Sequence, residues 1–319
     1  MPYQGSKSAV ADNIIEFLPC GKRFVDLFGG GAAMSHCAVL SGKYDSVYYN
    51  ELNPLLCDLL KRAIDGEFNY SRFKPEFISR EEFHERKDVD GYVRYVWSFG
   101  NKGTTYLFGS DIEPLKRSMH NFVVFGIKDD FIKSNFDDID KFIVDKDIHD
   151  RRIAVKKYLR LKQKTIRSLI DEQQNEATER LQQLERLQRL QQLEQLQRLQ
   201  QLEQLEQLEI NCGSYLDYEY QDGDVVYCDP PYEGTEGYNQ TKFNHKEFYD
   251  WVATRPYQVF FSSYEISDKR FSRIWQKEKQ NIMNGGSGQF TVTEYIYTNK
   301  TIQHNTENPL SIFQSVLYG

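Results

Sequence analysis

The feature that most constrains the fold is the regular alternation of strand-like and helix-like segments near the start of the chain. The sequence predicts, in order, a helix at 8–18, a strand at 23–28, a glycine turn at 29–31, a strand at 46–52 and a helix at 54–64. Short apolar strands that alternate with helices are typical of a parallel α/β sheet. We therefore expect residues 1–66 to form the first part of such a sheet.

The alternation stops after Gly66 and returns from residue 210. The segment 67–179 is largely polar and aromatic and has no strand–helix rhythm, which indicates an inserted, mostly helical domain. Beyond it, the expected elements are a strand at 224–228, a helix at 245–254, a strand at 257–263, a helix at 270–276 and a strand at 289–300. The sequence thus predicts one α/β domain, built from 1–66 and 210–319, around an insertion.

Composition excludes several classes of protein. The 319 residues suffice for one large domain or two ordinary ones, and the net charge of -7 argues against a non-specific nucleic-acid coat. The five cysteines are widely spaced, which argues against a disulfide framework and against a structural zinc site. The histidines are scattered, and no apolar stretch is long enough to span a bilayer. We expect a cytoplasmic protein with no metal and no membrane partner.

A basic segment lies in the middle of the chain. Residues 151–167 hold eight Lys or Arg and no acid. Arg152, Lys156, Arg160 and Lys164 are four apart, so they share one face of a helix. Like charges at this spacing repel one another. A line of phosphates would turn the repulsion into attraction, and the alternative is a solvated helix face.

A leucine repeat follows. Residues 180–209 consist of Leu, Gln, Glu and Arg alone, with ten leucines three apart. A period of three differs from the 3.5 of coiled coils, and on an α-helix it makes the apolar stripe retreat by about 60° per triplet. We expect an extended helical arm that packs spirally or meets a protein partner. The alternative is a low-complexity insertion with no function of its own.

The first chemical motif is FVDLFGGGAA at 24–33. Asp26 ends a strand, and the glycines after it let the backbone approach a ligand at a helix N-terminus. The turn fits NAD, FAD, S-adenosylmethionine or a simple tight connection, but the G-x-G-x-x-G spacing of a dinucleotide site is missing, since Met34 holds its last position. Glu51 ends the next strand, where a carboxylate can accept hydrogen bonds from both hydroxyls of a ribose.

The second motif is VVYCDPPY at 225–232. Two prolines end a strand because neither donates to a sheet ladder. Asp229 and Tyr232 therefore stand on a stiff elbow at the edge where α/β sheets bind ligands. The Asp229 carboxylate and the Pro230 carbonyl are two acceptors that suit an NH₂ group, and Tyr232 offers a face for stacking. A planar ring that bears an amine, adenine or cytosine, fits this chemistry.

Three blocks of sequence resemble the Dam-type DNA adenine-N6 methyltransferases, the D12 class with the alpha order of motifs. They are PYQGSKSAVADNIIEFLP at 2–19, FVDLFGGGAA at 24–33 and VVYCDPPYEGTEGYN at 225–239. The resemblance covers about 1–66 and 210–300. It implies a Rossmann-like S-adenosylmethionine-dependent methyltransferase sheet with an inserted DNA-recognition domain. The implied reaction is direct methyl transfer to a flipped-out base in duplex DNA, with S-adenosylhomocysteine as product.

The resemblance also assigns roles to single residues. Asp229 would orient the target amine, Tyr232 would stack on the base, and the catalytic elbow would consist of Asp229, Pro230, Pro231 and Tyr232. The positions implied for the cofactor are Tyr3, Lys7, Asp26, Phe28, Gly29, Gly30, Gly31, Glu51, Leu52, Ser214, Tyr215 and Asp229. Three positions depart from the family pattern: Glu51 where Asp is frequent, Ala32 where glycine is frequent and Ser214 where Asp is usual.

Recognition of the duplex would fall to 67–179. The segment 98–109 has the pattern of a hairpin whose tip could reach base edges in a major groove, and basic side chains would bind phosphates. The candidate DNA contacts are Asn101, Lys102, Thr104, Arg117, Arg152, Lys156 and Arg160. Two alternatives stay open: cytosine-N4 methylation, and a DNA-binding protein that keeps the fold without catalysis. The expected location is on DNA in the cytoplasm of a bacterial or phage-infected cell.

Overall fold

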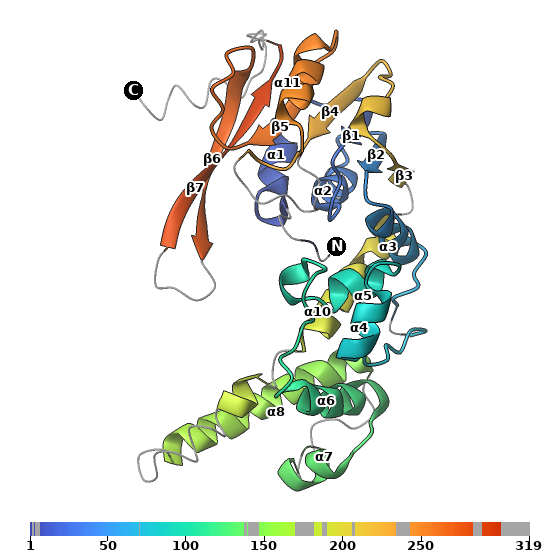
Figure 1. The fold of residues 1–319 in the computed structure, drawn as a ribbon, viewed down its shortest axis with the longest axis vertical. Helices are drawn as coiled ribbons and strands as arrows, with labels where there is room; N and C mark the ends of the chain where they lie inside the picture. Colours follow the sequence, from blue (N-terminus) through green and yellow to red (C-terminus); the bar gives the residue numbers. More distant parts are fainter. Residues whose placement is uncertain are drawn as a thin grey trace.

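The computed structural model has a bent outline, with a sheet at one end and a group of helices at the other (Figure 1). The structure describes residues 1, 3, 7–69, 71–136, 139, 147–169, 182–186, 190–205, 208–233, 243–282 and 289–300, without the side chains of 165–169, 279–282 and 289–292. Several parts of the sequence predictions lie outside the described residues: 170–179 of the insertion, Leu181 and Leu187 of the repeat, 234–239 of the third block, and 301–319.

The sheet has seven strands in the order β3-β2-β1-β4-β5-β7-β6. The strands are β1 Arg23–Asp26, β2 Ser46–Glu51, β3 Leu208–Cys212, β4 Asp224–Cys228, β5 Val259–Ser263, β6 Ser272–Ile282 and β7 Gln289–Thr298. The first five are parallel, and β7 and β6 are antiparallel additions at one edge. The α/β sheet that the alternation predicts is confirmed, and β1, β2 and β4 end side by side.

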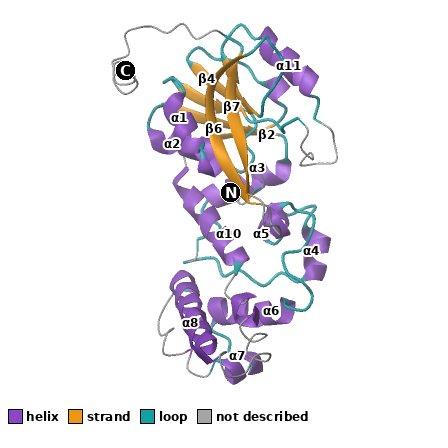
Figure 2. Cartoon of the chain, turned by 90° about the vertical axis from the view of Figure 1, so that its left-hand side faces the viewer, coloured by secondary structure: helices purple, strands orange, loops and turns teal. Residues whose placement is uncertain are grey.

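Helices cover both faces of the sheet and build the other end of the molecule (Figure 2). Those at the sheet are η1 Lys7–Ala9, α1 Ala11–Phe17, α2 Ala33–Ser41, α3 Pro54–Ile64, η5 Tyr215–Asp217 and α11 His245–Thr254. The others are α4 Arg80–Arg86, α5 Gly91–Val96, η2 Phe99–Asn101, α6 Glu113–Phe125, α7 Asp130–Asn135, α8 Ile148–Leu169, α10 Gln191–Gln200 and η4 Gln201–Leu205. Successive strand residues point to opposite faces, so Phe24 packs with α1–α3 and Val25 with α11.

Two strands differ from the sequence prediction. Residues 270–276, expected as a helix, lead into β6, which pairs with β7 along its length. A β-bulge between Arg273 and Trp275 shifts the side-chain alternation, so the period of two that indicates a strand is broken there. β3 is not among the expected strands, because polar residues interrupt its apolar pattern. One of them, Asn211, donates a hydrogen bond of 2.6 Å to Asn50 on β2.

The leucine repeat is buried, so the expectation of an extended arm is wrong for its described part. Exposure is at most 9% for each of Leu184, Leu190, Leu193, Leu196, Leu199, Leu202, Leu205 and Leu208. These leucines already pack inside the chain that carries them. They therefore offer no apolar stripe to a second protein, and the described part of the repeat belongs to the hydrophobic interior.

The period of three explains how the single helix α10 packs against two different hydrophobic clusters. Successive leucines on α10 step back by about 60°, so the apolar stripe turns as the helix advances. Leu193 packs with α6 and α8, whereas Leu196 and Leu199 pack with α3 and α5. In the 3₁₀ helix η4, residues three apart are eclipsed, so Leu202 and Leu205 stay on one side. The spiral packing that the repeat predicts is confirmed.

Within the residues that the structure describes, the hydrophobic interior forms three clusters. The largest joins α1, α2 and α3 with residues of the expected insertion, such as Phe83 and Trp97. A second cluster holds α11 against the opposite face of the sheet. A third holds α6, α7 and α8 together at the far end of the molecule. Packing is thus continuous across the expected boundary after residue 66, and the insertion is anchored directly on the sheet domain.

β6 and β7 project beyond the rest of the sheet as a two-stranded ribbon. β5 pairs with 295–298 of β7, whereas β6 remains paired with β7 as far as Ile282 and Gln289. The ribbon runs along the concave side of the molecule towards the helical end (Figures 1 and 2). Glu294 is the first residue of β7 past its pairing with β5, so it lies at the base of this ribbon.

Candidate active site

Three carboxylates lie at the carboxyl edge of the parallel strands. Asp26 ends β1, Glu51 ends β2, and Asp229 directly follows β4. β1 lies between β2 and β4, and Asp26 is opposite Tyr49 on one side and Tyr227 on the other. The topology therefore brings together the acids of both sequence motifs, although one motif follows the other by about two hundred residues in the chain.

The glycine turn after β1 is held from β2. A Cβ on Gly29 would lie 2.1 Å from the Tyr49 ring, and Gly30 has a positive φ of 46°, so both positions require glycine. The Tyr49 hydroxyl donates a hydrogen bond of 2.9 Å to the Gly30 carbonyl. One Glu51 oxygen accepts from the Gly30 amide, and the other accepts from the Asn53 amide, both at 2.9 Å. Glu51 thus fixes the shape of the turn.

Ala32 replaces a frequent glycine at a strained position. Its backbone is left-handed, with φ 58° and ψ 26°, which costs an alanine about 1–2 kcal/mol. The methyl group is fully buried, and burial of a carbon of this kind contributes about 0.8 kcal/mol. This burial offsets part of the strain of an alanine in the left-handed region.

Asp26 is a buried acid with one unused oxygen. Its side chain is 1% exposed, and Oδ2 accepts a hydrogen bond of 2.7 Å from the Ser35 hydroxyl. Within the described part of the chain, Oδ1 has no hydrogen-bond partner. Burial, reinforced by the charges of Asp229 and Glu51, raises the pKa of Asp26 to about 7. An unsatisfied buried acceptor is costly, so a donor or cation from a ligand would be stabilised at this oxygen.

Lys7 lies at the centre of the elbow. Its Nζ is 2.6 Å from Asp229 Oδ1 and 3.1 Å from Glu294 Oε1, and it stands over the Tyr232 ring at 4.7 Å. The Tyr232 hydroxyl donates to Glu294 at 2.9 Å. Tyr232 also meets Tyr264 edge-on, with ring centroids 4.6 Å apart. The resemblance implied a cofactor contact for Lys7, and the geometry makes it a neighbour of the catalytic elbow.

Two carboxylates share this one ammonium. Burial opposes the charged form of Lys7, but Asp229 and Glu294 more than compensate and raise its pKa above the usual value. Burial also raises the pKa of Asp229; the neighbouring Lys7 lowers it and Glu294 raises it. Two carboxylates and one ammonium therefore lie in contact in a site that is largely shielded from water.

The residues expected around the cofactor ring lie on the α11 side of the sheet. Phe28 and Tyr215 pack against each other, with ring centroids 5.1 Å apart, among aromatic side chains of α11. The Ser214 hydroxyl accepts a hydrogen bond from the Leu216 amide and caps η5. Leu52, at the end of β2, is 72% exposed. Phe28 and Tyr215 thus form an aromatic surface beside the strand ends.

Comparison with known protein families identifies the family of the chain. One family model, described as D12 class N6 adenine-specific DNA methyltransferase, matches residues 3–308. The chain belongs to this family. It is therefore an enzyme of adenine-N6 methylation in DNA, which favours adenine over cytosine-N4 and catalysis over binding alone. No curated protein matches the chain.

Three further features of this D12-class enzyme concern membrane-spanning helices, metal-binding groups and disulfides. Among the residues that the structure describes, no helix is long and apolar enough to cross a membrane. The same residues contain no group of three His, Cys, Asp or Glu side chains placed to hold a metal ion. The five cysteines are free thiols.

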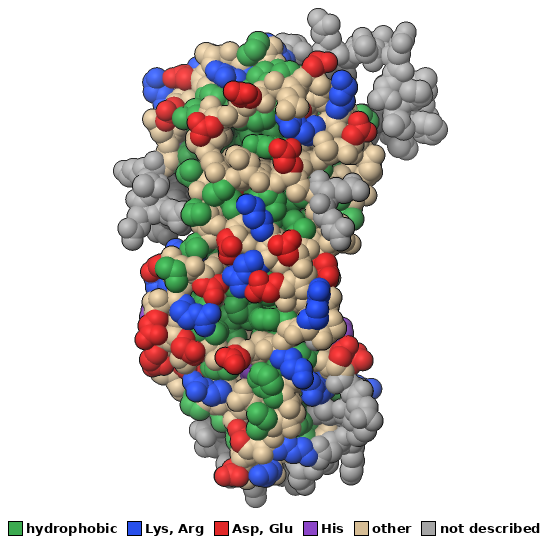
Figure 3. Space-filling view, turned by 90° about the vertical axis from the view of Figure 1, so that its right-hand side faces the viewer, with side chains coloured by type: hydrophobic (Ala, Val, Ile, Leu, Met, Phe, Trp, Pro, Cys, Tyr) green, Lys and Arg blue, Asp and Glu red, His purple; other side chains and the backbone are tan. Residues whose placement is uncertain are grey.

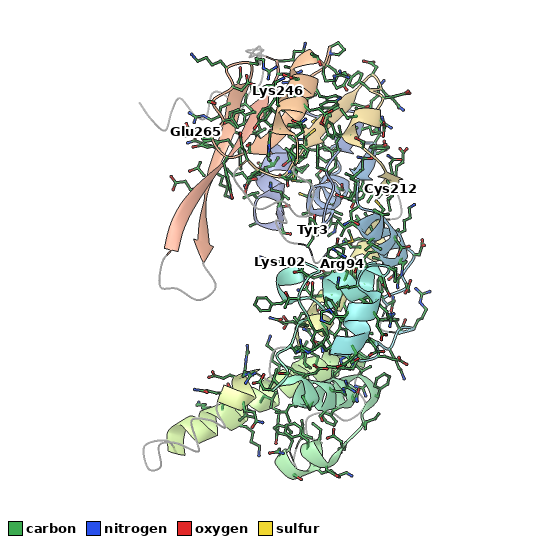
Figure 4. The ribbon with its side chains drawn as sticks, in the orientation of Figure 1. Tyr3, Arg94, Lys102, Cys212, Lys246 and Glu265 are labelled. Carbon is green, nitrogen blue, oxygen red and sulfur yellow. The ribbon has the colours of Figure 1, made fainter. Side chains whose placement is uncertain are left out.

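The loop expected to meet base edges is attached to the glycine turn through aromatic contacts. Tyr3 lies against Gly30 and meets the Tyr95 ring edge-on at 5.7 Å. Asn101 has a positive φ of 57° and donates a hydrogen bond of 2.7 Å to the Tyr95 carbonyl, so its amide group serves the loop itself. Lys102 and Thr104 are exposed. In Figure 4, the labels of Lys102 and Tyr3 both lie at the junction of the two ends of the molecule.

The basic residues expected to bind phosphates fall into two groups. Arg152 and Lys156 face α10, where Glu194 lies 3.5 Å from the first and 3.3 Å from the second. Their mutual repulsion is therefore offset within the chain, and a phosphate would compete with Glu194 for both side chains. Arg160 is exposed, and Arg117 is half exposed on α6.

Three functional neighbours were missed by the sequence analysis. Glu294 binds Lys7 and the elbow tyrosine, and a lone acid in the apolar alternation of β7 was the available signal. His245, at the start of α11, places Nε2 2.8 Å from the Pro231 carbonyl. Asn50 is buried and donates to the Leu27 and Gly213 carbonyls, both at 3.1 Å, which ties three strand ends together. No local pattern distinguishes His245 and Asn50 from ordinary surface positions.

Proposed function

We propose that the enzyme transfers a methyl group from S-adenosylmethionine to the N6 nitrogen of an adenine that has left the stack of duplex DNA. The observation that carries this proposal is the elbow: a largely buried carboxylate, Asp229, whose side chain is 17% exposed, near an aromatic ring, Tyr232, at the edge of a parallel sheet. Asp26 and the glycine turn lie at the neighbouring strand end. The two halves of the site can therefore hold a methyl donor and a base next to each other.

Two features support S-adenosylmethionine as the donor. Asp26 Oδ1 is a buried acceptor without a partner in the described residues, and it suits the cationic amino group of the methionine part. At Gly29 and Gly30 no side chain separates the backbone from a ligand, while Phe28 and Tyr215 offer an aromatic surface to the adenine ring. When bound, S-adenosylmethionine supplies an electrophilic methyl group on a sulfonium sulfur.

The elbow suits the exocyclic amine of adenine. The nitrogen lone pair is delocalised into the ring, so the amine is a poor nucleophile until its geometry changes. Two acceptors, the Asp229 carboxylate and the Pro230 carbonyl, would hold its hydrogens and direct the lone pair outwards. Charge-assisted hydrogen bonds of this kind contribute about 1.5–3 kcal/mol each, and stacking on Tyr232 would offset part of the cost of extracting the base.

The duplex would bind on the concave side of the molecule. Lys102, Thr104 and Arg160 are exposed side chains of the helical part that could meet phosphates or base edges. The opposite, convex side mixes acidic and basic side chains and offers no continuous basic surface (Figure 3). We retain 67–179 as the recognition region on this basis, with Lys102 and Arg160 as its first candidates.

The decisive experiment is to express the protein in cells that lack adenine methylation and to sequence their DNA for modified bases. The proposal predicts N6-methyladenine within one short motif. The purified protein should produce the same modification in duplex DNA supplied with S-adenosylmethionine, measured by mass spectrometry of nucleosides. Methylation restricted to single-stranded DNA or to RNA contradicts the duplex assignment, and N4-methylcytosine contradicts the base.

Asp26 is expected to couple cofactor binding to proton release. Its pKa of about 7 in the free protein means that it is mostly protonated at pH 6, and only its carboxylate attracts an ammonium group. Affinity for S-adenosylmethionine should therefore rise roughly tenfold between pH 5.5 and pH 7 and then level off. Calorimetry in two buffers of different ionisation enthalpy measures the released proton. Asp26→Asn should bind without this pH dependence, and a flat native profile contradicts the role.

A further inference from the structure

Glu294 is a buried acid that belongs to neither sequence motif. Its side chain is 2% exposed, and it stands on β7 where the pairing with β5 ends. One oxygen, Oε1, is 3.1 Å from the Lys7 ammonium and also accepts the hydrogen bond of 2.9 Å from the Tyr232 hydroxyl. A single carboxylate oxygen therefore contacts both the cation and the aromatic ring of the elbow.

Lys7 acts as the shared counter-ion of two carboxylates. Its distances of 2.6 Å to Asp229 and 3.1 Å to Glu294 differ little. The other lysine near Glu294 is Lys277, its cross-strand partner on β6, and that ammonium donates to Asn13 on α1. Without Glu294, Lys7 would pair with Asp229 alone and neutralise the acceptor that the target amine needs. Glu294 thus divides the positive charge between two acids.

This division matters because charge moves during the reaction. As the bond from N6 to the methyl carbon forms, the carbon–sulfur bond breaks with its electron pair left on sulfur, and N6 becomes positive until it loses one of its protons. The Asp229 carboxylate is placed to accept that proton, which can then pass to water. Two carboxylate groups set against a single ammonium favour the positive nitrogen of the transition state over the neutral amine of the ground state.

We propose that Glu294 is a positioning residue of methyl transfer: it fixes the Tyr232 ring through the hydroxyl and shares Lys7, so that Asp229 remains an effective acceptor for the amine. This inference rests on the proposed function, because it assigns the amine to Asp229. It goes beyond the elbow motif, since Glu294 acts through Lys7 and Tyr232 and touches neither the base nor the methyl donor.

The test is Glu294→Gln, which keeps the shape and an acceptor oxygen for Tyr232 but removes the charge. We expect kcat to fall about 10- to 100-fold, with the KM values for DNA and for S-adenosylmethionine within about threefold of native. Glu278→Gln is the matched control, because Glu278 is an exposed glutamate on the paired strand β6. It should leave kcat and both KM values unchanged.

A double-mutant cycle tests whether Glu294 acts through Lys7. In a Lys7→Gln background there is no ammonium left to share, so Glu294→Gln should lower kcat by less than about threefold. The Lys7→Gln background also keeps the test valid if Glu294→Gln alone is unstable. Without the Lys7 ammonium, Glu294 is a buried carboxylate that has lost its cation, so replacing it by glutamine should not destabilise the protein further. A further tenfold loss in this background overturns the proposal, as does a single variant with native kcat or with a change confined to the KM for DNA.

The outcomes separate this inference from the function on which it rests. If the native protein makes N6-methyladenine and Asp229→Ala does not, the proposed function stands whatever Glu294→Gln does. Unchanged kcat in Glu294→Gln then rejects the positioning role alone. If the native protein makes no N6-methyladenine in duplex DNA, the proposed function fails before the Glu294 variants are compared.

Discussion

Replacing Asp229 by alanine is expected to lower the single-turnover rate of methylation about a thousandfold and to leave the affinity for duplex DNA within about twofold. The variant loses a charge-assisted acceptor for the target amine, and it leaves the Lys7 ammonium facing the nitrogen that becomes positive. The native distance of 2.6 Å between Lys7 and Asp229 shows how close that charge would be. Lys7 keeps Glu294 as a partner, so the fold of the elbow should survive.

The matched control is Asp222→Ala, which changes an exposed aspartate in the turn before β4. It should methylate at the native rate. Rapid-quench assays with a labelled methyl donor measure the rate, and fluorescence anisotropy of a labelled duplex measures binding. If Asp229→Ala keeps more than a tenth of the native rate, the catalytic assignment of Asp229 is wrong. A parallel loss of duplex binding would instead indicate a damaged fold.

The part of the fold that the sequence predicted is the part encoded locally. Strands 23–28 and 46–52 and the helix 54–64 have clear periodicity, and Pro54 begins that helix where a proline at the first turn is expected. The β-bulge at Arg273 and Trp275 breaks the alternation of β6, and a helix was predicted in its place. Local pattern recognises regular elements and fails where a strand is irregular.

The residues of the candidate site also divide into those that the sequence analysis found and those that it missed. Asp26, Glu51 and Asp229 were found from sequence because strand ends of a parallel sheet converge at one edge, whatever the details of packing. Glu294 was not found, because its partner Tyr232 is 62 positions away and Lys7 lies at the opposite end of the chain. A pairing of this kind depends on how β7 enters the sheet, which no local pattern records.

In the basic helix, the sequence indicates the shared face correctly but does not reveal the acid that lies against it. Arg152 and Lys156 do share a face of α8 with the spacing that the sequence indicates. Their partner, however, is Glu194 of the leucine repeat, a segment that was expected to stand away from the rest of the chain. The contact between the two segments was missed because the sequence analysis treated them as separate, and the phosphate contacts stay a prediction.

Replacing Leu199 by alanine is expected to lower the free energy of unfolding by about 3 kcal/mol. Leu199 is fully buried on α10 and belongs to the cluster that joins the sheet domain to the helices. The cost combines the lost burial of the side chain with the cavity that remains. A loss of this size is a large fraction of the stability of a typical domain. The loss is measured by denaturant unfolding of the native protein and the variant, with both curves fitted to the same slope m.

The matched control is Leu40→Ala, because Leu40 is a leucine of helix α2 that is 62% exposed. Its effect should stay within about 0.5 kcal/mol. Leu193→Ala should match the cost of Leu199→Ala while acting on the other cluster, with α6 and α8. If both buried leucines can be replaced at no cost, the repeat is a dispensable low-complexity insertion after all. If both are costly, a period-three leucine stripe in this enzyme is the element that fastens its helical part to its catalytic sheet.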